Sequence, residues 1–164
     1  MSVFRSLCVL CLAACAAFGQ TAQGPTQPIP FSHKLHIGEV KLTCTDCHTY
    51  PAKFGDSIGT PGAPKCLECH AFSTRQTTTL ANLNGYVAKN QTVPWVRIFA
   101  LRDFVFFDHR YHLMNGATCE GCHGDVGSQD VLADTLGTTK MTFCQPCHVK
   151  SGAKAGCNTC HDPR

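Results

Sequence analysis

The apolar positions of this chain predict few regular elements. Leu80, Leu83 and Val87 recur with helical spacing, which predicts an amphipathic helix capped by Ser73 or Thr74. No comparable periodicity marks the rest of the chain after residue 19. The pattern therefore favours isolated helices over a continuous bundle or a sheet.

Residues 93–107 are mostly aromatic and β-branched, which favours extended chain over helix. Gly and Pro interrupt much of the remainder, so we expect a mostly irregular fold of short α-helices and long loops with little β-structure. A chain of 164 residues with so little patterned apolar surface has a small core of its own. Domains of this kind usually need covalent or metal staples.

Residues 1–19 predict an export signal. Arg5 supplies a positive start, and residues 7–18 form an apolar run too short to span a bilayer comfortably. The order Leu12-Ala13-Ala14-Cys15 resembles a bacterial lipobox, which would place a lipid on Cys15 and hold the protein at a membrane surface. The alternative is an ordinary signal peptide cut near Gly19. Both interpretations predict an exported protein, periplasmic or extracellular.

Charged residues make up 15% of the chain, and the formal net charge is +3. This balance indicates neither a nucleic-acid-binding surface nor an acidic tail.

Ten of the thirteen cysteines fall in five Cys-x-x-Cys pairs, each followed directly by histidine. This is the attachment signature of c-type haem, in which the two thiols bond the haem vinyl groups and the histidine becomes the proximal iron ligand. Structural zinc and a disulfide framework also use paired cysteines, but neither explains a histidine after every pair. The sequence therefore predicts five covalent haems. In chain order, motifs one to five are Cys44-Thr45-Asp46-Cys47-His48, Cys66-Leu67-Glu68-Cys69-His70, Cys119-Glu120-Gly121-Cys122-His123, Cys144-Gln145-Pro146-Cys147-His148 and Cys157-Asn158-Thr159-Cys160-His161.

The four remaining histidines lie in two copies of Phe-x-His-x-x-His. These are His33 and His36 before motif one, and His109 and His112 before motif three. A spacing of three residues puts both imidazoles on one face of a helix. Each iron has room for one distal ligand, so we expect each pair to reach two different haems.

Ten axial positions and nine histidines leave one position without a histidine. Met141, three residues before Cys144, is the preferred candidate. Met114, a lysine, water or an open position are the alternatives. A His/Met haem has a higher potential than its bis-histidine neighbours, which would suit the end of a relay.

The motifs divide the mature chain into segments. We expect a Pro- and Gln-rich tether at 20–30, a dihaem module at 31–70, a connecting segment without haem at 71–106 and a trihaem module at 107–164.

These motifs resemble those of the class III multihaem cytochromes c, the cytochrome c3 and c7 group. In that family the first histidine of Phe-x-His-x-x-His ligates the haem that follows it, and the second ligates a neighbour. The resemblance implies that His33 serves motif one and His109 serves motif three, whereas His36 and His112 reach other haems.

The chain is also similar to the pentahaem subunit of alternative complex III and to pentahaem subunits beside molybdopterin-type oxidoreductases. The similarity covers residues 31–161 and includes Pro94-Trp95-Val96-Arg97, Asp103-Phe104-Val105-Phe106-Phe107 and Met141-x-x-Cys144. It implies bis-histidine ligation of four haems and a methionine on the fifth. It also implies membership of a respiratory redox complex.

The leading hypothesis is an electron carrier without catalytic residues. It would pass electrons from a membrane-associated, quinol-linked donor to a periplasmic or extracellular acceptor, as a subunit of a hetero-oligomer. Two other hypotheses are a small multihaem reductase, which needs one open iron, and a subunit of an extracellular cytochrome filament.

Overall fold

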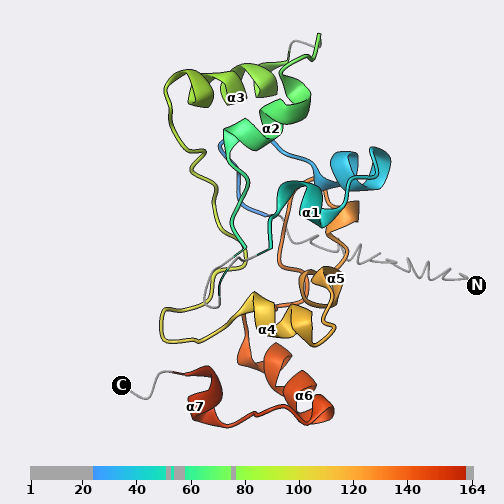
Figure 1. The fold of residues 1–164 in the computed structure, drawn as a ribbon, viewed down its shortest axis with the longest axis vertical. Helices are drawn as coiled ribbons and strands as arrows, with labels where there is room; N and C mark the ends of the chain where they lie inside the picture. The colour runs from blue at the N-terminus through green and yellow to red at the C-terminus, as the bar shows by residue number, and fades with distance from the viewer. Residues whose placement is uncertain (1–23, 51–52, 54–57, 75–76, 162–164) are drawn as a thin grey trace, which may run out of the picture.

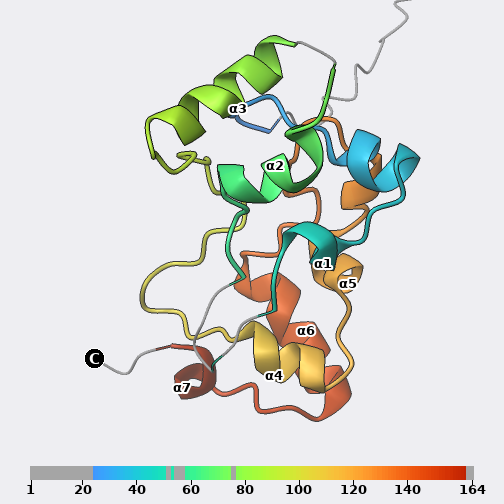
Figure 2. The same cartoon turned by 45° about the horizontal axis from the view of Figure 1, so that its top comes forward.

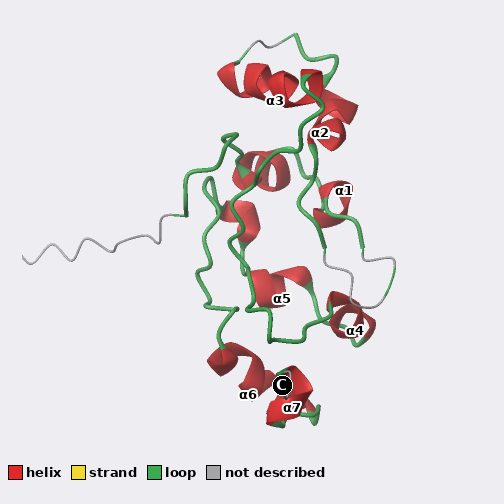
Figure 3. Cartoon of the chain, turned by 90° about the vertical axis from the view of Figure 1, so that its left-hand side faces the viewer, coloured by secondary structure: helices red, strands yellow, loops and turns green. Residues whose placement is uncertain are grey.

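The computed structural model describes residues 24–50, 53, 58–74 and 77–161; the export signal and the start of the tether lie outside these ranges. The described chain is built of short helices and irregular segments (Figures 1 and 3), as the sequence predicts. Its one strand-like pairing is an antiparallel bridge between Val105 and His161. In chain order the helices are η1 (Lys34–Glu39), α1 (Cys44–Cys47), α2 (Ala63–His70), α3 (Thr78–Ala88), α4 (His109–Met114), α5 (Cys119–His123), η2 (Val126–Ser128), α6 (Met141–Ser151) and α7 (Cys157–Cys160).

The helices are spread along one long axis instead of packing into layers. Figure 1 shows α3 and α2 at one end, α1 and α5 in the middle, and α6 and α7 at the other end. Figure 2 keeps the same order after a turn of the molecule. None of the helices in the described ranges is long and apolar enough to cross a membrane.

The main polypeptide core lies at the α2–α3 end. Ile29, Ala63, Leu83 and Val93 are buried together there. Trp95 packs against this cluster and donates its indole Nε1–H to the Pro61 carbonyl at 2.9 Å. The core thus joins segments from both sides of the first two motifs.

The helix predicted around Leu83 is present as α3, but the predicted cap is wrong. Thr77 is the N-cap, and its Oγ1 accepts the Leu80 amide at 3.2 Å. Ser73 instead closes the end of α2, where its amide donates to the His70 carbonyl at 3.2 Å. Ser73 therefore belongs to the turn that ends α2, and α3 begins only after Thr77.

No helix lies between α3 and α4, which confirms the extended segment predicted at 93–107. Gln27 holds this segment from the N-terminal side. Its Nε2 donates to the Val96 carbonyl and its Oε1 accepts the Val96 amide, both at 2.9 Å. The side-chain amide therefore pairs with the backbone of Val96 as a neighbouring strand would.

Outside the α2–α3 end, the described chain has almost no buried apolar residue; Ala133 is the exception. Large apolar side chains are exposed there instead, among them Phe104 at 56% and Met114 at 70%. Burial of apolar surface is the main force that stabilises a folded chain. This chain consequently needs apolar mass that its own side chains do not supply.

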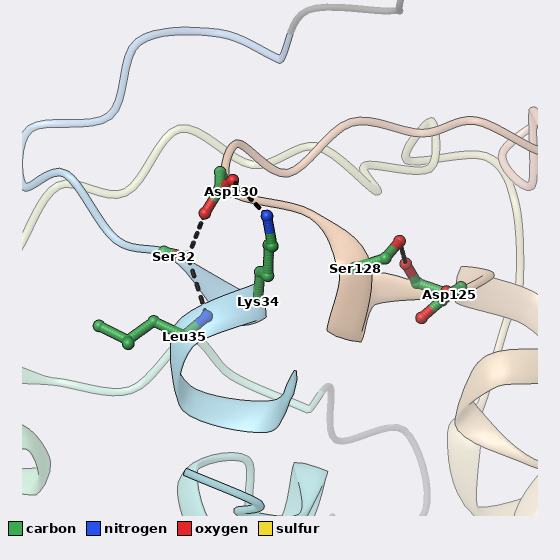
Figure 4. Close-up of polar contacts among 6 residues, drawn as sticks. All are labelled: Ser32, Lys34, Leu35, Asp125, Ser128 and Asp130. Atoms are coloured by element: carbon green, nitrogen blue, oxygen red, sulfur yellow. Dashed lines mark hydrogen bonds and ion pairs between the residues drawn. The ribbon is translucent and has the colours of Figure 1, made fainter. Parts of the chain in front are cut away.

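η1, which follows the first Phe-x-His pair of residues, is held against η2 and the loop after motif three (Figure 4). Ser32 donates its hydroxyl to Asp130 at 2.7 Å, and Lys34 Nζ lies 3.5 Å from the same carboxylate. The backbones also approach closely, since a Cβ built on Gly38 would lie 2.9 Å from the Gly127 carbonyl oxygen. A residue larger than glycine at 38 would push η1 away from η2.

Replacing Leu83 with alanine should lower the free energy of unfolding by about 2–4 kcal/mol, because it opens a cavity in the only sizeable apolar cluster of the described chain. Val87→Ala on the same helix is the control, since Val87 is 37% exposed and its loss should cost no more than about 0.5 kcal/mol. Denaturant unfolding measures both. Equal effects of the two substitutions would contradict the proposed core.

Candidate haem sites

Short helices present the Cys-x-x-Cys-His motifs. Motifs one, three and five begin at the first residue of α1, α5 and α7, motif two ends α2, and motif four lies in α6. Thr118 caps α5 by accepting the Gly121 amide on its Oγ1 at 3.1 Å. A helical turn places cysteines three residues apart on one face, with the histidine next along the chain. This is the arrangement that two thioether bonds and one proximal ligand require.

The ten motif cysteines are free thiols of intermediate or full exposure. No group of three or more His, Cys, Asp or Glu side chains gathers as a bare-metal site anywhere in the described ranges. A structural zinc site needs four such ligands around one point. The separation of the motifs therefore favours one large cofactor at each motif.

The two Phe-x-His-x-x-His copies have the same geometry. Phe31 lies edge-on to His33, with ring centres 4.9 Å apart, and stacks on His36 at 4.5 Å. Phe107 repeats both contacts with His109 and His112, each at 4.6 Å. In both copies one phenyl ring therefore restrains two imidazoles.

Backbone carbonyls select the tautomer of the second histidine in each copy. Nδ1–H of His36 donates to the Ser32 carbonyl, and Nδ1–H of His112 donates to the Asp108 carbonyl, both at 2.8 Å. A carbonyl can only accept, so Nδ1 carries the proton and Nε2 keeps its lone pair. Nε2 is thus the nitrogen left for a metal.

Two proximal histidines are oriented in the same way. Nδ1–H of His48 donates to the Gly59 carbonyl at 2.9 Å, and Nδ1–H of His148 donates to the Lys154 carbonyl at 2.7 Å. By contrast, the Nδ1 atoms of His33, His123 and His161 are buried without a hydrogen-bond partner. An iron bond at Nε2 is an interaction that would fix these rings.

Three of the histidines expected as distal ligands lie near histidines expected as proximal ligands. Two imidazoles on opposite sides of one iron have ring centres about 6 Å apart, given metal–nitrogen bonds of about 2 Å and about 1 Å from nitrogen to ring centre. The observed separations are 6.1, 6.4 and 6.0 Å for the pairs His36–His70, His109–His123 and His112–His148. The residues present therefore fit haem iron held on both faces.

His33 neighbours His48, the histidine of motif one. Burial is the main reason that the pKa of His33 falls to about 4, and the neighbouring charges of His48 and His36 lower it further. The pKa of His109 is also lowered, first by burial and then by His123. Both rings are therefore neutral at pH 7, as a metal ligand must be.

His161 has no histidine opposite it. Its ring centre lies 5.6 Å from that of Phe104, and the Phe106 amide donates to the Cys160 carbonyl at 2.7 Å. Motif five is therefore the candidate for the axial position without a histidine. Met141 begins α6, one turn before Cys144. Burial is the main cause that raises the pKa of Cys144, and the nearby charge of Cys160 raises that pKa further.

Met114 lies elsewhere, at the end of α4. It lines a hollow of about 370 Å³ with Tyr50, Arg110 and Leu113. This hollow borders the module of motifs three and four, where His109 and His112 already neighbour His123 and His148. The position of Met114 at this hollow thus favours Met141 as the candidate ligand at motif five.

Ser32 and Asp108 were not expected to contribute to the sites. Ser32 Oγ accepts the Leu35 amide at 3.0 Å, and Asp108 Oδ1 accepts the Arg110 amide at 2.8 Å. Asp108 thereby caps α4, whereas Ser32 precedes His33, the N-cap of η1. In both copies the carbonyl of this residue orients the second histidine. The signal was available in the sequence, because the residue between Phe and the first His is a favoured N-cap in both copies.

Comparison with known proteins agrees with this geometry. Residues 105–162 match the family described as cytochrome c7 and related cytochrome c. The chain is also 28% identical over 161 residues to the multiheme cytochrome c subunit of menaquinone reductase from Nitratidesulfovibrio vulgaris (strain Hildenborough). That alignment covers 82% of this chain and 76% of the relative.

Replacing Asp108 with alanine should lower the free energy of unfolding by about 1 kcal/mol, because the first turn of α4 loses its cap. Asp108→Asn keeps an acceptor for the Arg110 amide and should retain most of the stability. Denaturant unfolding of the haem-loaded protein compares the two variants. A loss from Asn as large as that from Ala would show that the cap bond is not the reason.

Proposed function

Because this chain is a multihaem cytochrome c of class III, we propose that it relays electrons through five covalently bound haems as a subunit of a redox complex. Haem iron, when bound, supplies one-electron chemistry between its ferric and ferrous states. The observation that carries the proposal is the pairing of distal with proximal histidines at about 6 Å.

The chain's own residues hold and orient the cofactors. Paired thiols on one helical face fix each porphyrin, and the proximal histidine follows at once. Carbonyls of Ser32 and Asp108 keep the Nε2 lone pairs of His36 and His112 available. Histidine on both faces keeps water and substrates away from the metal, which favours a carrier over a catalyst.

The proposed donor is membrane-associated and quinol-linked. The relative, which is named as a subunit of a menaquinone reductase, supports a quinone-linked membrane complex. Its name makes the quinone an electron acceptor there, so the choice of a quinol as donor to this chain is a proposal of its own. This chain would then work outside the cytoplasmic membrane, periplasmic or extracellular, with a lipid on Cys15 as its proposed anchor. Its proposed partners are the quinone-reactive subunits of the same complex, because the relative is named as a subunit of a menaquinone reductase.

The complex can be tested with an affinity-tagged copy of the full chain purified from membranes of its source. We expect a reduced naphthoquinol to reduce the haems rapidly in the complex and much more slowly in the separated chain. Absorbance of the reduced c-type haem measures both rates. Equal rates for the two samples would contradict a quinol-linked subunit.

The alternative function is a small reductase acting at the iron of motif five. It is favoured by one observation, the lack of a histidine opposite His161. An open or water-bound iron gives a high-spin ferric signal in electron paramagnetic resonance that an added ligand removes. Wholly low-spin haems would exclude the reductase.

Met141 is the proposed second ligand at motif five, and its removal should lower the highest reduction potential of the protein. Met141→Ala leaves an open or water-bound iron, whereas thioether ligation raises the potential. Met114→Ala is the matched control and should leave all potentials unchanged. Redox titration of both variants decides, and an unchanged highest potential in Met141→Ala would exclude this ligand.

A further inference from the structure

The five motifs follow one another in space in an order that differs from their order in the sequence. The first indication is η1, which joins motifs one and two. Its His36 lies 6.1 Å from His70 of motif two, while His33 at its start neighbours His48 of motif one. Cys47 of motif one is also close to Cys69 of motif two.

The helix α4 joins motifs three and four in the same manner. His109 lies 6.4 Å from His123 of motif three, and His112 lies 6.0 Å from His148 of motif four. The motifs themselves are also close, since Cys122 is near Cys147. η1 and α4 thus each connect the first two motifs of their own module.

The modules meet through their first motifs. Cys44 of motif one lies near Cys119 of motif three. His48 is likewise near His123. The contact of η1 with the loop after motif three, through Ser32 and Asp130, holds this junction from outside (Figure 4).

Motif five lies beyond motif four. Cys144 is near Cys160, and α6 and α7 form the end of the molecule opposite α2 and α3 (Figure 1). The extended segment 104–106 closes this end, because Val105 forms a bridge with His161.

From these contacts we infer that the haems form one unbranched row in the order two, one, three, four, five. This inference rests on the proposed function. The two ends of the row are then the site of His70 beside the α2–α3 core and the site of His161 at α7. Redox partner proteins would dock at these two ends, because each inner site has a neighbouring site on both sides.

The axial ligands give the row a direction. The His161 end lacks a second histidine, whereas His70 is paired with His36. A haem with thioether ligation has a higher potential than one with two histidines. The donor therefore docks at the α2–α3 end, and the acceptor docks at α7.

Proton NMR of the fully reduced, diamagnetic protein tests the order. Each haem is first assigned through contacts to the β-protons of its own cysteines. We expect nuclear Overhauser contacts from the haem of motif two to the haem of motif one alone, and from the haem of motif one to those of motifs two and three. A contact between the haems of motifs two and three, or none between those of motifs one and three, would overturn the order.

Two variants make the assignment independent of the cysteine signals. His36→Met should shift the resonances of the haem at motif two, and His112→Met those of the haem at motif four. The number of haem spin systems tests the proposed function separately. Fewer than five would refute the function, whereas five with other neighbours would refute only the order.

Discussion

The fold depends on histidine pairs held about 6 Å apart, because a pair at that separation can grip one iron from both sides. The two members of a pair come from different helices. Each bound iron thereby links segments that the polypeptide alone leaves poorly connected. η1 carries His36 and has His33 as its N-cap, and α4 carries His109 and His112. One short helix could thereby link two cofactors.

This constraint explains why the chain folds with so little core. Its apolar cluster at α2–α3 covers one end, and large side chains such as Met114 remain exposed elsewhere. A chain of 164 residues ordinarily offsets its loss of conformational entropy by burying apolar surface. Here porphyrin rings would supply that surface, and axial ligation would fix their orientation. Stability and electron transfer thus depend on the same residues.

The sequence identifies candidate site residues better than their arrangement in space. Cys-x-x-Cys-His and Phe-x-His-x-x-His are local patterns, so spacing alone singles out these residues, and their part in binding haem stays a prediction. The irregular chain with short helices followed from its Gly and Pro content. The cap of α3 was mispredicted, because Ser73 and Thr77 have similar intrinsic preferences and only the end of α2 separates them. The spatial order of the motifs depends on long-range contacts such as Cys44 with Cys119, which no local pattern encodes.

Near-infrared magnetic circular dichroism of the oxidised protein tests the central claim most directly, because the charge-transfer band of low-spin ferric haem depends on both axial ligands. The account predicts four haems with two histidines and one haem with a single histidine. Two or more haems with a single histidine would contradict the pairing on which the fold and the proposed relay depend.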